Sequence, residues 1–184
     1  MRLVMILNQI QAGMGTKDDV QVPLTATKEV IGPGVTLKPL LAEHEQNLLV
    51  TIYMGEQTYR EAPDVVQRKI KGMLQRLNIE GVVCGPSFNY PEFSKMSLEL
   101  AQDIQENTSL KVVCAMSEEN GALISDYKEA IDIVKMPKKG GVGLNESYKA
   151  ICKVLQAKEN NKSREAYKQF VFKTGKHPKE VRNV

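Results

Sequence analysis

A strand–helix–strand pattern runs through residues 48–84, with LLVTIYM at 48–54, PDVVQRKIKGMLQRL at 63–77 and GVVC at 81–84. The two strand segments are apolar on consecutive positions, which indicates burial on both faces, as in a parallel sheet covered by helices. Between them, Val66, Ile70 and Leu74 recur at helical spacing. Pro63 suits a first helical turn, where its missing N–H costs nothing. The pattern predicts a right-handed crossover unit.

The same alternation extends to both sides of this unit. Further strands are predicted at 3–7, 111–116 and 131–136, and further helices at 91–106 and 144–156. We therefore predict an α/β fold, a three-layer sandwich around a mostly parallel five-stranded sheet. The expected winding is flavodoxin-like or Rossmann-like, doubly wound, with strand order 2-1-3-4-5. Ligands in such sheets bind beyond the strand carboxyl ends, here in the loops after the first and third strands.

Composition is that of a globular protein, with 184 residues, 42% hydrophobic and 26% charged. We predict an α/β domain over residues 1–158 and a basic carboxyl-terminal extension over 159–184. No apolar run reaches the ~18 residues that span a bilayer, and the opening residues lack a signal cleavage site, so we expect a cytoplasmic protein without membrane contact. Aromatic residues are sparse among the lysines from position 135 to 158, where Tyr148 is the single one, and this favours a solvated surface over nucleic-acid binding.

Cofactor and metal signals are weak. The turn Gly13-Met14-Gly15 lacks the third glycine of a dinucleotide fingerprint. Glu118 and Glu119 are adjacent acids with no third ligand in view, which favours a turn over a metal site. We therefore predict neither a cofactor nor a metal. The three cysteines have apolar neighbours and wide spacing, so we interpret them as buried free thiols: Cys84, Cys114 and Cys152.

Polar or glycine-bearing segments surround the predicted strand ends. The first strand runs into Asn8 and a glycine turn, and the third is followed by residues 85–91, which include Ser87 and Asn89. Such loops can contact a substrate, although the same residues also form ordinary connecting turns. Ser87 would be a nucleophile only beside a base. Because neither histidine, His44 or His177, falls in a loop expected to face it, we predict no catalytic residue.

The order of these segments resembles the amino-terminal part of the selenoprotein subunit of component B in the glycine, sarcosine and betaine reductases. The resemblance covers about residues 1–155. Two of its segments, Cys84-Gly85-Pro86-Ser87-Phe88-Asn89 and Glu118-Glu119-Asn120, are similar to the family's Gly-Pro-Ala-Phe-Asn segment and Glu-Glu-Asn turn. The others are Asn8-Gln9 with Ala12-Gly13-Met14-Gly15, then Ile31-Gly32-Pro33-Gly34, and Gly55 after a strand.

The resemblance implies a substrate-specific subunit of amino-acid reduction. In that family, a partner subunit holds the amine substrate on a pyruvoyl group while selenocysteine attacks the carbon next to nitrogen. Family subunits are more than twice as long, with selenocysteine in their carboxyl-terminal part. We therefore expect a short stand-alone homologue without selenocysteine or a complete catalytic set, working as a subunit of a glycine reductase-like oxidoreductase.

The resemblance also implies a ligand and partners. We expect a small amino acid or amine-bearing ligand, a partner reductase subunit, and a homo-oligomer. Glu119 would meet an ammonium group, and backbone N–H groups near Gly13 and Gly34 would take a carboxylate. The predicted ligand-binding residues are Asn8, Gly13, Gly15, Gly32, Gly34, Gly55, Ser87, Asn89 and Glu119.

An alternative from another class is a non-catalytic interaction or scaffold protein with a decayed site. In that case the basic segment after Lys158 would contact a partner, and its apolar side chains Tyr167, Phe170 and Phe172 would dock on it.

Overall fold

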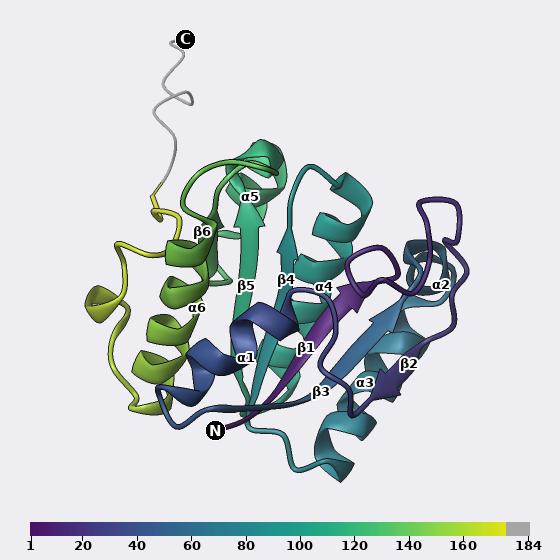
Figure 1. Cartoon of the computed structure of the whole chain (residues 1–184), viewed down its shortest axis with the longest axis horizontal. Helices are drawn as coiled ribbons and strands as arrows, with labels where there is room; N and C mark the ends of the chain where they lie inside the picture. The colour runs from purple at the N-terminus through teal and green to yellow at the C-terminus, as the bar shows by residue number, and fades with distance from the viewer. Residues whose placement is uncertain (176–184) are drawn as a thin grey trace, which may run out of the picture.

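A six-stranded sheet lies between two layers of helices in the computed structural model, which describes residues 1–175 (Figure 1). In space the strands follow the order β2-β3-β1-β4-β5-β6, and all neighbours are parallel except β2 and β3. The central strand β1 is buried from Leu3 onward, because its consecutive apolar side chains have helices on both sides. The strands are β1 (Arg2–Asn8), β2 (Thr25–Thr27), β3 (Asn47–Met54), β4 (Gly81–Ser87), β5 (Lys111–Ser117) and β6 (Ile133–Met136).

The predicted three-layer α/β class is confirmed, but the predicted five strands and their order are corrected by β2. This strand pairs antiparallel with β3 at the sheet edge, where Thr25 lies opposite Tyr53 and Thr27 opposite Thr51. Three residues are too few to show a periodicity in the sequence, so the pairing with β3 decides that they form a strand. The five parallel strands by themselves run β3-β1-β4-β5-β6.

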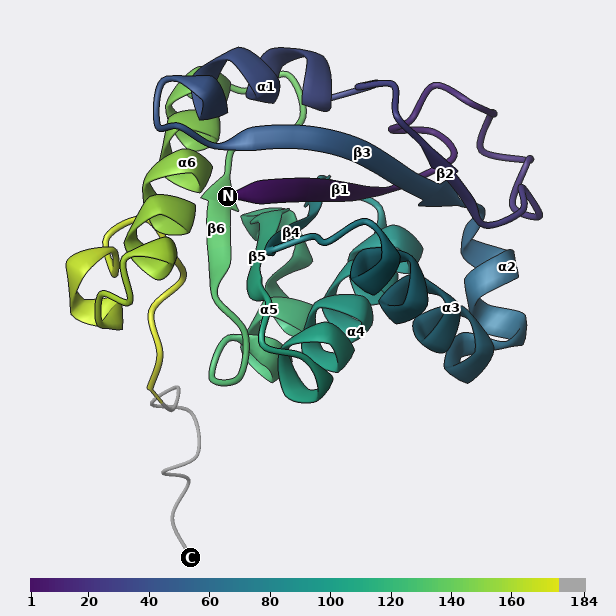
Figure 2. The ribbon, with the colours of Figure 1, turned by 90° about the horizontal axis from the view of Figure 1, so that it is seen from below.

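Helices cover both faces of the sheet (Figure 2). On one face α1 (Gly34–Ala42) packs against β3 and α6 (Leu144–Glu159) against β5 and β6. On the other, α4 (Pro91–Asn107) packs against β4 and β5, flanked by α2 (Glu56–Glu61), α3 (Pro63–Arg76) and α5 (Gly121–Tyr127). Two short 3-10 helices are η1 (Glu118–Asn120) and η2 (Arg164–Ala166). None of the helices within residues 1–175 combines the length and hydrophobicity needed to cross a membrane.

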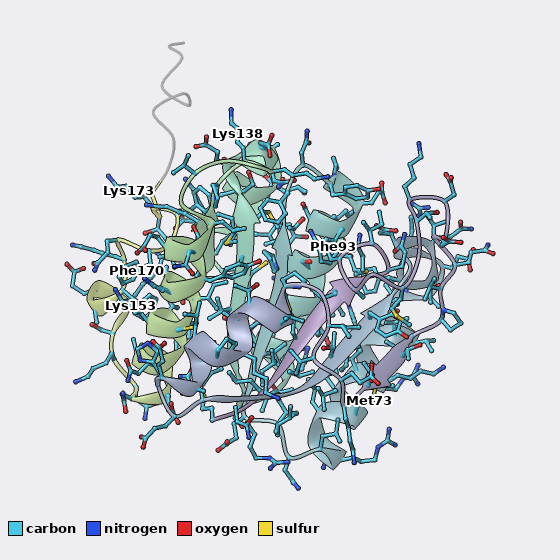
Figure 3. All side chains as sticks on the ribbon, in the orientation of Figure 1. Met73, Phe93, Lys138, Lys153, Phe170 and Lys173 are labelled. Atoms are coloured by element: carbon cyan, nitrogen blue, oxygen red, sulfur yellow. The ribbon has the colours of Figure 1, made fainter. Side chains whose placement is uncertain are left out.

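The chain beyond α6 returns to the sheet edge. Val171 forms an antiparallel bridge with Val134 of β6, and both Tyr167 and Val171 are buried. Phe170 packs against the core, with the Lys153 ammonium 5.3 Å from its ring centroid (Figure 3). These side chains therefore contact this domain itself. A domain boundary at residue 158 and a partner contact by this segment stay predictions, and positions 176–184, which include His177, lie outside the described residues.

Candidate functional site

The winding of the sheet reverses at β1. From β1 the chain passes through β2 and α1 to β3 on one side, and then crosses through α3 to β4 on the other side. In Figure 1 the arrowheads of β1, β4 and β5 point toward the upper side of the view, so their following loops meet at one edge. A reversal of this kind separates the loops after the two central strands and opens a crevice between them.

A cleft of about 590 Å³ occupies this position. We call it the switch-point cleft. It is lined by the loops after four strands, so side chains far apart in the sequence face one space. Its lining residues are Asn8 at the end of β1 with Ile10 and Gln11 after it, Phe88, Asn89 and Tyr90 after β4 with Phe93 in α4, Glu119 after β5, and Lys138, Lys139, Gly140 and Gly141 after β6 with Leu144 at the start of α6.

Charges of both signs line the switch-point cleft. The Glu119 carboxylate accepts a hydrogen bond from the Ser117 hydroxyl at 3.1 Å. Lys138 and Lys139 extend from the loop before α6, and Figure 3 shows Lys138 near the end of the sheet. Within residues 1–175, neither Glu119 nor these lysines forms an ion pair. All three side chains are exposed, so their charges are available to a ligand.

Asn8 is buried where the cleft meets the end of β1. Its side-chain oxygen accepts from the backbone N–H of Gln11 at 2.8 Å, which shapes the turn after β1. Its Nδ2 donates to the carboxylate of Glu56 at 2.7 Å. Asn8 therefore links the loop after β1 to the start of α2.

Ser87 lies beneath the loop after β4 and not on its surface. Its side chain is fully buried, and its hydroxyl shares a hydrogen bond with that of Ser94 in α4. Ser94 in turn donates to the side-chain oxygen of Asn120 at 2.8 Å. The structure thus places Ser87 in a network that supports the cleft loops, and a direct contact between Ser87 and a ligand stays a prediction.

The predicted glycines lie in turns near the strand ends, and the structure gives several of them a packing reason. Gly13 and Gly32 have φ of +69° and +56°, which glycine adopts most readily. A Cβ on Gly32 would lie 2.0 Å from the carbonyl oxygen of Gln11, and one on Gly55 would lie 2.1 Å from that of Val20.

The remaining two glycines pack less tightly, since an added Cβ would lie 2.8 Å from the Asp19 side chain at Gly15 and 2.9 Å from the Val30 side chain at Gly34. Gly15 lies against the Asp19 side chain, and Gly34 begins α1 against Val30 and Leu48. Of the nine predicted site residues, the structure brings Asn8, Asn89 and Glu119 together in the cleft lining, whereas Ser87 and the five glycines lie outside it. A ligand contact by any of the nine stays a prediction.

Lys138 and Lys139 were missing from the predicted site. The signal was present in the sequence, because Lys138-Lys139-Gly140-Gly141 follows the predicted strand 131–136 after a single proline and precedes a predicted helix. Like Asn89 and Glu119, this segment follows the carboxyl end of a parallel strand, where ligands bind in such sheets.

Fold and cleft together define a doubly wound α/β protein with a polar crevice at its switch point. The chain belongs to the glycine/sarcosine/betaine reductase selenoprotein B family, whose sequence profile matches residues 1–182. The resemblance seen in the sequence is thereby confirmed.

Three similar proteins carry related names. The sarcosine reductase complex component B subunit beta of Peptoclostridium acidaminophilum is 24% identical over 135 residues, which cover 73% of this chain and 30% of that protein. The glycine reductase complex component B subunit gamma of Symbiobacterium thermophilum is 26% identical over 120 residues, which cover 65% of this chain and 28% of that protein.

The subunit of the same name from Carboxydothermus hydrogenoformans is 24% identical over 133 residues, which cover 72% of this chain and 30% of that protein. The matched region thus spans less than a third of the length of each of these relatives. No solved structure matches the chain at a significant level.

Proposed function

We propose that the switch-point cleft binds a small amino acid or another amine-bearing ligand, and that the chain acts as a component B-like subunit of a reductase complex. The proposal rests mainly on the opposite charges in one cleft, Glu119 from the loop after β5 and Lys138 and Lys139 from the loop after β6. An amino acid carries an ammonium and a carboxylate a few ångströms apart. A cleft with separate anionic and cationic groups can pair both.

Each group has a role in this proposal. Glu119 pairs with the ammonium, and Lys138 and Lys139 pair with the carboxylate, with help from the backbone N–H group of Gly140. The Asn89 amide donates or accepts a further hydrogen bond. A ligand of five to eight heavy atoms offers at most about 1.5 kcal/mol per atom, so its dissociation constant has a lower bound from about micromolar for five atoms to about nanomolar for eight.

The relatives support the second half of the proposal, because they are named as subunits of sarcosine and glycine reductase complexes. In the proposed complex this chain binds and orients the ligand, and a partner subunit supplies the groups that react. Self-association belongs to the same proposal, and light scattering coupled to size-exclusion chromatography measures it.

Calorimetric titration with glycine, sarcosine, betaine and proline tests the ligand. Saturable binding of at least one is expected, weakened tenfold or more in Glu119→Gln and in the double variant Lys138→Gln/Lys139→Gln. Lys69→Gln is the matched control, because Lys69 is exposed on α3, far from the cleft lining. Absence of heat with all four compounds from a folded protein would count against the proposal.

A further inference from the structure

A second cavity, of about 250 Å³, lies between α2 and α4. Asn8 lines the switch-point cleft and Glu56 lines this cavity. The hydrogen bond from Asn8 to Glu56 therefore separates the cleft from the cavity. Glu56, Tyr59 and Met96 form its buried side, with exposures of 5%, 4% and 2%. We call it the α2–α4 cavity.

The charged groups of the α2–α4 cavity leave one carboxylate without a counter-ion. Its lining holds three carboxylates and two cations. Arg60 pairs with Glu92 at 2.6 Å, and Lys95 lies 3.8 Å from Glu99. Glu56 is the third carboxylate, and no cation pairs with it in the part of the chain that the structure describes.

The hydrogen bonding of Glu56 is also incomplete. One carboxylate oxygen accepts from the Asn8 amide at 2.7 Å, and within residues 1–175 no other hydrogen bond reaches this carboxylate. An ionised carboxylate can accept about four hydrogen bonds, so Glu56 keeps acceptor sites for a ligand. Its second oxygen is not among the buried side-chain atoms without a partner in residues 1–175, so it can be reached from the α2–α4 cavity that Glu56 lines.

We propose that the α2–α4 cavity binds a small organic ammonium ion, a primary or methylated amine, with Glu56 as its counter-ion. The Tyr59 ring and the Met96 thioether lie in the same lining, and such polarisable groups suit N-methyl or N-methylene carbons beside the charge. Within residues 1–175, no three side chains of His, Cys, Asp or Glu are gathered as a metal would need. This site is separate from the switch-point cleft and does not depend on the function proposed for it.

Titration of the isotope-labelled protein with methylammonium chloride and trimethylammonium chloride, followed by amide NMR spectra, tests the site. Sodium chloride at matched ionic strength serves as the reference. We expect saturable shifts for the amides of Thr58, Tyr59 and Met96. Glu56→Gln should weaken the binding at least tenfold, because a Gln oxygen can still accept from Asn8 while the charge is lost. Glu61→Gln, the same change on the exposed end of α2, should leave the affinity within twofold.

Three outcomes overturn the site: no saturable shifts with either amine, the same shifts with sodium chloride, or an unchanged affinity in Glu56→Gln. If Glu56→Gln does not fold, the amides that shift in the unmodified protein show where the amine binds. Shifts confined to the switch-point cleft would then reject the proposal. A glycine titration of the same samples separates the two proposals, because Glu56→Gln is expected to leave glycine binding in the switch-point cleft in place.

Discussion

The side-chain amide of Asn120 donates to the main-chain carbonyl of Phe88 at 2.7 Å and so joins the turn after β5 to the loop after β4. The side-chain oxygen of the same residue accepts from Ser94, whose hydroxyl also contacts Ser87. Asn120 is 6% exposed. Because Glu119 precedes Asn120 and Asn89 follows Phe88, this contact fixes two walls of the switch-point cleft relative to each other.

Asn120→Ala should destabilise the protein by about 1 to 3 kcal/mol, because the Phe88 carbonyl and the Ser94 hydroxyl would each lose a buried partner. Asn120→Asp keeps the acceptor for Ser94 but puts a carboxylate oxygen opposite the carbonyl oxygens of Phe88 and Ser117, so we expect a loss at least as large as that of Asn120→Ala. Urea denaturation measures both. Asn107→Ala is the control, since the Asn107 side chain bonds only within the exposed end of α4; equal losses at the two positions would contradict this role for Asn120.

Gly32→Ala should be strongly unfavourable. Gly32 has a positive φ, and an added Cβ would lie 2.0 Å from the Gln11 carbonyl oxygen, so the backbone must move at a cost of roughly 2 kcal/mol or more. Gln11 lines the switch-point cleft, and ligand affinity should fall as well.

The matched change is Gly72→Ala within α3, where an added Cβ meets nothing within 4 Å. This variant should gain about 0.5 to 1 kcal/mol, because alanine favours a helix interior. The free energies of unfolding of both variants are compared in urea. A neutral Gly32→Ala would mean that the turn at Gly32 accommodates a side chain by a small shift.

Most of the fold could be predicted because its signals are local. The helical spacing of Val66, Ile70 and Leu74 and the apolar runs at 48–54 and 81–84 each lie within one element. The edge strand β2 could not be predicted from the sequence, because Thr25–Thr27 becomes a strand only through its pairing with β3.

The candidate site also has a part that could be predicted from the sequence and a part that could not. Asn89 and Glu119 could be placed near one edge because topology alone brings parallel strand ends together. The burial of Ser87 depends on its contact with Ser94, and that of Glu56 depends on Asn8, 48 positions away. Such contacts are set by tertiary packing and leave no periodic pattern in the sequence. Lys138 and Lys139 were missed for another reason, since a run of lysines is usually a solvated surface.

Asp132 holds the segment after α6 against the sheet edge. Its carboxylate pairs with Lys158 at 2.7 Å and with Arg164 at 2.8 Å, and it accepts from the Tyr167 hydroxyl at 2.9 Å. Burial by itself raises the pKa of Asp132, but the charge of Lys158 and the hydrogen bonds from Lys158, Tyr167 and Arg164 outweigh it, so that the pKa is lowered.

A carboxyl whose pKa is lower in the folded than in the unfolded state stabilises the protein above its unfolded pKa of about 3.9. That contribution is lost as the pH falls through the folded-state pKa. Asp132→Asn should therefore cost about 2 to 3 kcal/mol at pH 7, because it leaves a part-buried cation cluster without its anion. The difference from wild type should shrink below pH 4. Urea denaturation at pH 7 and at pH 3 measures this, with the exposed Asp126→Asn as control; a difference independent of pH would contradict the linkage.

The thiols of Cys84 and Cys114 lie opposite each other on β4 and β5, and Cys152 is buried in α6. Burial raises the pKa of the Cys84 thiol well above its usual value, and it raises the pKa of Cys114 and of Cys152 to about 12. Since the thiolate is the reactive form, a pKa near 12 leaves roughly one group in ten thousand ionised at pH 8. Access of a reagent also requires the core to open.

We therefore expect no rapid reaction of the folded protein with Ellman's reagent at pH 8, and reaction of all three cysteines in 6 M guanidinium chloride, where the core is exposed. Lys69→Cys provides the positive control, because it adds a thiol on the exposed face of α3 that should react at once. Rapid modification of one equivalent in the unmodified protein would show that one of the three thiols reaches solvent. That result would contradict the burial of all three cysteine side chains among the core residues of the sheet and α6.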